Sequence, residues 1–197
     1  MNRETYQAFT QELSKMANEQ LFNKLRDSTK TKVIVDNKDP IHKQTGGAYY
    51  HLQNRTVHLA DKNHEYLAHE LGHAEIDKNP LGYLLQSRIG RGLGNAAPSF
   101  ALINALRNTA TGTSVGRQVG ETAAIVALTA PLLAQEGLAS YKGVDILRSQ
   151  GATPEELDKY KAHMVEAWKT YATQATTAAA IGGVGIAATA LMKQITA

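Results

Sequence analysis

His69-Glu70-Leu71-Gly72-His73 is a short stretch within a run of residues that favours a helix. Residues four positions apart lie on the same face of a helix, so the imidazoles of His69 and His73 can bind the same zinc ion. Glu70 follows the first histidine and can act as the general base for a water bound to that metal. The spacing therefore predicts both a metal site and the carboxylate that uses it.

A β-hairpin is predicted immediately before this helix. Residues 48–52 and 55–59 form its two arms. Gln53-Asn54 forms the turn, because Asn tolerates the left-handed conformation that such turns need. Asp61 or Asn63 can cap the following helix. Two strands and a metal-binding helix thus follow one another closely along the chain.

The segment before the hairpin is expected to contain one helix and one strand. Residues 3–27 carry apolar side chains at helical spacing, from Tyr6, Phe9, Leu13 and Met16 to Leu21, Phe22 and Leu25. Lys32–Asp36 has a β-branched centre, which favours a strand. This strand can join the hairpin in a small sheet.

The chain beyond Pro80 is expected to be entirely helical. It is rich in Gly, Ala and Thr, and breaks are expected at Gly90–Gly94 and Thr111–Gly116. The motif helix is expected to end near Asn79-Pro80. The helices predicted after it are 81–90, 98–109, 115–134, 135–150, 154–170 and 171–193.

The expected fold class is α+β: mainly helical, with a small antiparallel sheet (the hairpin plus one strand) beside the motif helix. The 197 residues suit a single domain with an appendage. We therefore predict a metallopeptidase-like domain over residues 1–168. A C-terminal helix rich in Ala, Gly and Thr follows over residues 169–197.

Composition excludes several classes of protein and of site. The net charge is only +3 and the basic residues are scattered, so nucleic acid is not expected as a partner. The chain has no cysteine, so any metal must be held by histidines and carboxylates. Residues 1–30 are charged throughout and have no apolar core, so no secretory signal peptide is expected.

A catalytic zinc needs a third protein ligand, and the nearest positions are unsuitable. A metzincin would place a histidine where this chain has Asn79, and a glycine where it has Ile76. Glu75 and Asp77 stand on the motif helix but do not face the metal side. The third ligand is therefore expected from elsewhere in the chain.

Glu136 is the strongest candidate for that ligand. It is followed by Ala139 and by Ser140 at the next helical turn, and small residues there would let two helices approach. Ser140 could then hydrogen-bond a ligand histidine. Glu136 could instead be a solvated glutamate at a helix start, favoured by the helix dipole. The reserve candidates are Glu121, Glu155 and Glu156.

These pieces resemble the gluzincin zinc metallopeptidases of the HtpX and CAAX-prenyl-protease type. The residues that carry the resemblance are Gly47-Ala48-Tyr49-Tyr50, Ala68–Ala74 and Glu136–Gly143, within about residues 45–150. The resemblance implies that His69, His73 and Glu136 hold one Zn²⁺ ion, that Glu70 is the catalytic base, and that Tyr49 and Tyr50 lie on the edge strand that binds substrate.

The chain departs from that family in two places. The family usually has Asp where Ser140 stands, and its insert between the motif and the glutamate is more hydrophobic than the one in this chain. A weaker resemblance is to the ImmA/IrrE-like metallopeptidases, in which the glutamate ligand usually follows the motif after far fewer residues. Sixty-three positions separate His73 from Glu136 here.

The expected function is that of a zinc-dependent endopeptidase acting on a peptide or an unfolded protein. The substrate would lie along the hairpin edge as an extra strand. Tyr141, Arg148 and His163 are candidate donors to the oxyanion. His51 and His58 are expected on the sheet surface, and His64 is expected to face away from the metal.

A different class of function is also compatible with the sequence. Thr170–Met192 is 23 residues long, has no charge and could contact a membrane or a partner assembly. The expected location is therefore cytoplasmic or membrane-associated. The alternative to the peptidase is a non-catalytic or weakly catalytic structural or interaction protein of a membrane or virus-like assembly that retains a gluzincin fold.

Overall fold

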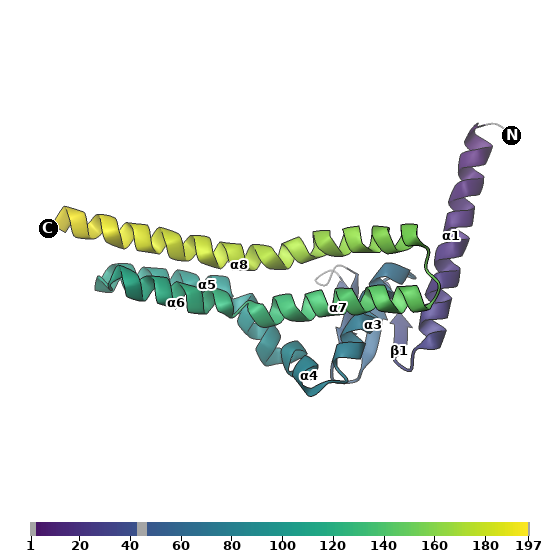
Figure 1. Cartoon of the computed structure of the whole chain (residues 1–197), viewed down its shortest axis with the longest axis horizontal. Helices are drawn as coiled ribbons and strands as arrows, with labels where there is room; N and C mark the ends of the chain where they lie inside the picture. The colour runs from purple at the N-terminus through teal and green to yellow at the C-terminus, as the bar shows by residue number, and fades with distance from the viewer. Residues whose placement is uncertain (1–2, 43–46, 197) are drawn as a thin grey trace. The chain divides into compact units, whose positions relative to one another are not determined.

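The computed structural model describes residues 3–42 and 47–196, which fall into two compact units (Figure 1). Unit 1 comprises Met1–Pro80 and Leu138–Met164, and unit 2 comprises Leu81–Gly137 and Val165–Ala197. The structure is 74% helical with one small three-stranded sheet, which confirms a mainly helical α+β fold. The helices of 81–137 group with the C-terminal residues, whereas the sequence placed them with the motif.

Unit 1 opens with helix α1 (Arg3–Ser28), followed by the sheet. Strands β1 (Lys32–Val35), β2 (Ala48–His51) and β3 (Thr56–Leu59) lie in the order β1-β3-β2. The hairpin β2–β3 is antiparallel, as predicted, but β1 pairs with β3 in parallel. The sheet is thus mixed, and the prediction of an antiparallel sheet was wrong, because the long connection after β1 places β2 on the far side of β3.

The hairpin turn differs from the prediction at one residue. Arg55 adopts the left-handed conformation, with φ 53°, in place of Asn54. The Thr56 hydroxyl donates to the Asn54 side-chain oxygen, which commits that side chain to the turn. Helix α3 (His64–Ile76) then begins at Asn63, whose side chain accepts from the amides of Glu65 and Tyr66 at 2.8 and 3.1 Å. This confirms Asn63 as the helix cap.

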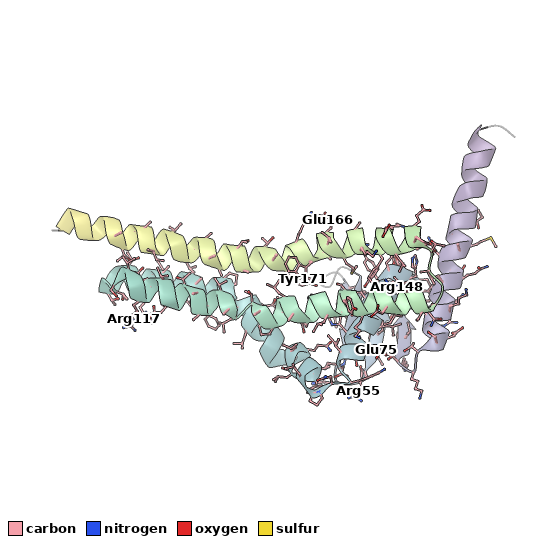
Figure 2. The ribbon with its side chains drawn as sticks, viewed as in Figure 1. Arg55, Glu75, Arg117, Arg148, Glu166 and Tyr171 are labelled. Atoms are coloured by element: carbon pink, nitrogen blue, oxygen red, sulfur yellow. The ribbon has the colours of Figure 1, made fainter. Side chains whose placement is uncertain are left out.

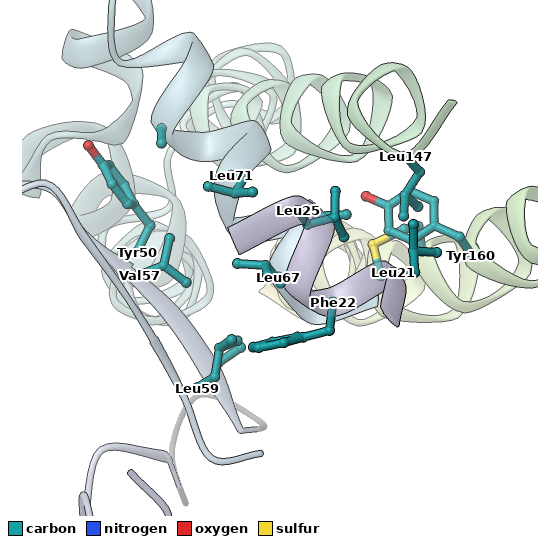
Figure 3. Packing of buried hydrophobic residues seen from close by; sticks show 14 of the residues in the cluster. Leu21, Phe22, Leu25, Tyr50, Val57, Leu59, Leu67, Leu71, Leu147 and Tyr160 are labelled. Atoms are coloured by element: carbon teal, nitrogen blue, oxygen red, sulfur yellow. The ribbon is translucent and has the colours of Figure 1, made fainter. Parts of the chain in front are cut away.

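The core of unit 1 joins α1, the sheet and α3 (Figure 3). Phe22 and Leu25 of α1 are completely buried against this core, as are Leu59 and Leu67. Complete burial of such a side chain contributes about 2 kcal/mol each. Met16 is 52% exposed, and Tyr6, Phe9 and Leu13 lie outside the side chains that the structure describes. The C-terminal half of the predicted apolar stripe therefore forms the core contact.

The remaining helices are α4 (Pro80–Gln86), α5 (Arg88–Thr111), α6 (Val115–Ala127), α7 (Ala130–Ser149) and α8 (Pro154–Thr196). Three of them, α5, α7 and α8, are longer than predicted, and the other two, α4 and α6, are shorter. The break at 111–116 is confirmed, with Gly112 at φ 61°. No break occurs at 90–94 or at residue 170, so those two predictions were wrong. In both places the chain stays helical despite its weak helix formers, because packing overrides local propensity.

The break between α6 and α7 lies at Leu128-Thr129, earlier than the predicted position near 134. Pro131 stands in the first turn of α7, where its missing N–H costs nothing. Glu136 is therefore inside a continuous helix, and the alternative of a solvated helix-start glutamate does not apply. Helices α7 and α8 each pass from one unit to the other.

One described helical stretch, Val115–Ser149, is long and apolar enough to cross a membrane. The expected membrane contact at 170–192 lies on α8, where the side chains of residue 174 and of 191–197 are outside the described part.

Candidate metal centre

The structure brings together the three residues that the sequence selected as metal ligands. His69 and His73 stand one turn apart on α3, and Glu136 stands on α7. One potential ligand atom from each lies within 4.8 Å of the other two. The two imidazole rings are 4.8 Å apart and nearly perpendicular. His73 and Glu136 are buried and His69 is half-buried, so this group could hold a metal ion with one side open.

Two glycines allow the helices that carry the group to approach. A Cβ on Gly72 of α3 would overlap the backbone carbonyl of Ala139 on α7. A Cβ on Gly143 would overlap the Tyr160 hydroxyl and lie 3.1 Å from the Ala68 carbonyl oxygen. Close packing of α3 on α7 thus depends on these missing side chains. The small residue predicted after Glu136, Ala139, lies at this crossing.

Ser140 lies where a residue that orients a ligand histidine is expected. Its Oγ atom is 3.4 Å from His69 Nδ1, which leaves His69 Nε2 to face a metal. In such sites the second ring nitrogen of a ligand histidine is normally held by a polar partner, which fixes the ring. Ser140 is therefore suited to orient His69.

Tyr160 is a residue of this region that the sequence did not identify. It is completely buried, and its hydroxyl donates to the Ser140 carbonyl oxygen at 3.3 Å. Burial raises the pKa of Tyr160 strongly, and the negative charges of Glu70 and Glu65 add to that shift. Tyr160 thus remains a neutral donor. The apolar spacing of Leu157, Tyr160 and Met164 on α8 was the available signal.

Glu70, the predicted general base, is buried on α3 next to His69. Its position within the motif places it beside the potential metal ligands, on the turn that carries both histidines. A carboxylate held in this way beside a metal-bound water is suited to accept a proton from it.

Glu65 is a second residue that the sequence did not identify. It is buried one turn before His69 on α3, and its carboxylate lies 2.7 Å from His163 Nδ1 and 3.4 Å from the Lys159 ammonium group. The His163 ring also meets the Tyr66 ring edge-on, at 5.3 Å. His163, one of the three candidate oxyanion donors, thus contacts the motif helix.

The other two candidate oxyanion donors point elsewhere. Tyr141 is 62% exposed, and it follows Glu136 by five residues, which turns it to a different face of α7. Arg148 forms an exposed ion pair with Asp145 at 3.1 Å (Figure 2). It stands twelve residues beyond Glu136, a distance of about 18 Å along the helix. Neither residue is placed to serve the metal group.

Tyr49 and Tyr50 lie on β2, which is an edge of the described sheet. The Tyr49 hydroxyl donates to Asp39 at 2.6 Å and its ring stacks on His58 at 4.6 Å. Burial and then that hydrogen bond raise the pKa of Tyr49 to about 12. The Tyr50 hydroxyl donates to the buried Asp77 at 2.9 Å. Both side chains therefore stabilise the hairpin, and the backbone of β2 is what a substrate could meet.

Four of the carboxylates that were weighed against Glu136 have other partners. Asp77 accepts from Tyr50 and pairs with Arg55, as expected for a residue that does not face the metal. Glu156 bonds the amide and hydroxyl of Thr153, closing a helix cap. The remaining contacts are those of Glu75 with Lys78, and of Glu121 with Asn108, Arg107 and Arg117. Among the described residues, Glu136 is the carboxylate that joins the two histidines.

His51, His58 and His64, the other histidines for which the sequence made a prediction, follow it in part. His51 and His58 are half-buried on the sheet, and the His58 ring nitrogen Nε2 lies 3.0 Å from the Thr56 hydroxyl. His64 is buried, and burial lowers its pKa below the ordinary 6.5. None of the three belongs to the metal group found among the described residues.

Comparison with protein families, with curated proteins and with solved structures finds no match for this chain.

Proposed function

We propose that this chain is a zinc-dependent endopeptidase with one Zn²⁺ ion held by His69, His73 and Glu136. The observation that carries the proposal is the meeting of these three ligand atoms within 4.8 Å, from two different helices. Two histidines and one glutamate form a known ligand set for catalytic zinc, which keeps a fourth position for water or substrate. Glu70 completes the set of groups that peptide hydrolysis needs.

Each residue of the site has a defined task in this proposal. A bound zinc ion would polarise the scissile carbonyl and lower the pKa of its water. Glu70 is the carboxylate that would take up a proton from the attacking water and donate it to the leaving amine. Ser140 orients His69 through Nδ1. His163, which contacts Glu65 of the motif helix, is the proposed oxyanion donor.

The proposed substrate is a peptide or an unfolded chain. Strand β2 pairs with β3 on one side, and its other side is an edge of the described sheet. A peptide in extended conformation could add there as a further strand, held by backbone hydrogen bonds. A short edge of this kind favours a segment without structure of its own over a folded protein.

Three variants test the proposal. We expect one zinc per chain in the wild type by elemental analysis, and digestion of casein by the same samples. Glu136→Ala should lose both, whereas Glu75→Ala, on an exposed residue of the motif helix, should lose neither. Glu70→Gln should keep the zinc and lose the digestion. Zinc bound equally by wild type and Glu136→Ala would overturn the ligand assignment.

A structural or interaction protein that keeps this fold is the second candidate. It is favoured by the large apolar residues that unit 2 exposes, such as Ile103, Leu106 and Val184. In that case Glu70→Gln and the wild type would bind zinc alike, and neither would digest casein.

A further inference from the structure

Unit 2 buries small and polar residues and exposes large apolar ones. Its buried residues include Ala97, Ala101, Ala178, Asn108, Gln118 and Thr189. Ile103 and Leu106 of α5 are both 64% exposed, and Val184 of α8 is 71% exposed. Unit 1 has the opposite arrangement, with Phe22 and Leu25 completely buried. A helical bundle in water buries its large apolar residues and exposes its polar ones, so the arrangement in unit 2 is the reverse.

The helices of unit 2 meet through very small residues. Figure 1 shows α5, α6 and the C-terminal part of α8 alongside one another. A Cβ on Gly182 would overlap the Thr122 side chain, and a Cβ on Gly185 would overlap Ala105. Contacts of small residues, which bring backbones close, are how helices associate in lipid, where burial of large apolar residues gives no advantage.

Polar side chains hydrogen-bond to one another inside unit 2. The Thr189 hydroxyl lies 3.4 Å from Gln118 Oε1, and Gln118 donates to the Thr113 carbonyl oxygen at 2.8 Å. Asn108 donates to Glu121 at 2.8 Å. These bonds link α5, α6 and α8 near the turn that follows α5. These bonds give the buried polar groups at this end of the unit internal partners.

Uncharged stretches of the three helical segments lie at the same level. Residues 92–106 of α5, 122–135 of α6 and α7, and 170–192 of α8 contain no charged residue. The contacts of Gly185 with Ala105 and of Gly182 with Thr122 place them side by side. The uncharged stretch of α5 is about 22 Å long, and that of α8 is about 35 Å long. The hydrocarbon layer of a bilayer is about 30 Å thick.

The charges of unit 2 gather at the two ends of these stretches. Arg88, Arg91 and Lys169 stand at one end, and Arg107, Arg117 and Lys193 at the other. Glu121 pairs with both Arg107 and Arg117, at 2.7 and 2.8 Å. The unit has six basic and three acidic residues, a net charge of +3 that accounts for the whole net charge of the chain. Basic ends of this kind complement anionic lipid headgroups.

The exposed apolar surface includes a groove between α5 and α8. It has a volume of about 650 Å³ and is lined by ten uncharged residues, among them Leu102, Leu106, Ile181 and Val184. The stretch Val115–Ser149 is also largely uncovered, since only 28% of its most apolar 18 residues are buried. A core helix of a water-soluble domain would be mostly buried.

We propose that unit 2 is embedded in a lipid bilayer, with acyl chains against its outer faces and in this groove. The inverted burial, the small-residue contacts and the basic ends all favour lipid over water. They also favour lipid over a second copy of the chain, because a protein interface would not require charge to be removed from all three helical segments at one level. The inference is independent of the peptidase proposal.

The full-length protein tests this inference by flotation with vesicles of phosphatidylcholine and phosphatidylglycerol on a density gradient. The wild type should float, and it should stay bound after washes with high salt and with alkaline carbonate. The double variant Leu106→Lys/Val184→Lys places two charges on the groove. Each of the two charges should lower the floating fraction on the order of tenfold. Val35→Lys, at an exposed position of β1, is the matched control and should float like the wild type.

Three results would overturn the inference. The first is a wild type that stays at the bottom of the gradient as a soluble monomer. The second is flotation that high salt removes, which would mean a purely electrostatic surface contact. The third is a soluble oligomer that the double lysine variant dissociates, which would make the groove an interface between copies. An unchanged far-ultraviolet circular dichroism spectrum shows that each variant is still folded.

Discussion

At the residue scale, Ser140 is the polar neighbour of a proposed metal ligand. Its Oγ atom lies 3.4 Å from His69 Nδ1, a long and weak contact. We expect Ser140→Ala to weaken zinc binding about tenfold, and Ser140→Asp to strengthen it, because a carboxylate accepts more strongly from the imidazole N–H. Competition with a coloured chelator measures both. Ser149→Ala, a change on the same helix at an exposed residue, should leave the affinity unchanged.

Asp77 gives a residue-scale prediction about stability. Its carboxylate is buried, accepts from the Tyr50 hydroxyl at 2.9 Å and pairs with Arg55 at 3.1 Å. Asp77→Ala leaves the buried Tyr50 hydroxyl without that acceptor, so we expect a loss of about 2 kcal/mol in the free energy of unfolding. Urea unfolding followed by circular dichroism measures it.

The control for Asp77 is Asp145→Ala, which removes an exposed ion pair with Arg148. Such pairs contribute at most about 0.5 kcal/mol. Equal losses in the two variants would mean that the Tyr50–Asp77 contact does not hold the hairpin to the end of α3.

At the element scale, the crossing of α3 and α7 depends on Gly72. A Cβ there would overlap the Ala139 carbonyl oxygen, which is backbone and cannot turn aside. We expect Gly72→Ala to separate the helices, to cost about 2 kcal/mol of stability and to weaken zinc binding, because Glu136 moves away from the histidines. Gly120→Ala, where no atom lies within 4 Å, should not destabilise the protein. Zinc affinity and the free energy of unfolding, measured for both variants, test this prediction. Equal values for the two variants would contradict it.

Local signals account for what could be predicted at this scale. The motif helix, its Asn63 cap and the hairpin each follow from a few neighbouring residues, and all three are confirmed. Glu136 was selected because small residues follow it, and the structure brings it to His69 and His73.

Properties that depend on distant contacts could not be predicted in the same way. The parallel pairing of β1 depends on the path of a long connection. The continuity of α5 through 90–94 and of α8 through residue 170 depends on neighbouring helices, which compensate for weak helix formers. Glu65 and Tyr160 were missed because their partners, His163 and Ser140, are far away in sequence.

At the scale of the whole molecule, His64 makes stability depend on pH. Burial lowers its pKa in the folded state, an effect that Glu65 and Glu156 oppose and Lys159 reinforces. The unfolded chain takes up the proton near the ordinary pKa of 6.5, and the folded chain only at lower pH. The contribution of His64 is therefore fully present above 6.5 and is lost as the pH falls through the folded pKa.

We expect His64→Gln to reduce the loss of stability between about pH 7 and pH 5. Metal-free protein should be used, so that the zinc ligands do not add a pH dependence of their own. His51→Gln, at a half-buried position of β2, is the control. Identical pH profiles for wild type and His64→Gln would contradict this account.

The division into two units also predicts how the whole chain responds to truncation. Unit 1 ends at Met164, and its last helical turns supply Leu157, Tyr160 and Met164 to the core. A chain that stops after Met164 should therefore keep its zinc, within about threefold of the wild-type affinity, and lose vesicle flotation, because unit 2 loses its part of α8. A chain that stops after Glu156 also loses the Tyr160 contact to Ser140 and the His163 contact to Glu65, and should lose zinc as well. Elemental analysis of the two truncated chains measures their zinc. Zinc lost equally from both would mean that the metal centre needs the C-terminal part of α8. Zinc lost only from the shorter chain would mean that the residues up to Met164 are enough to hold it.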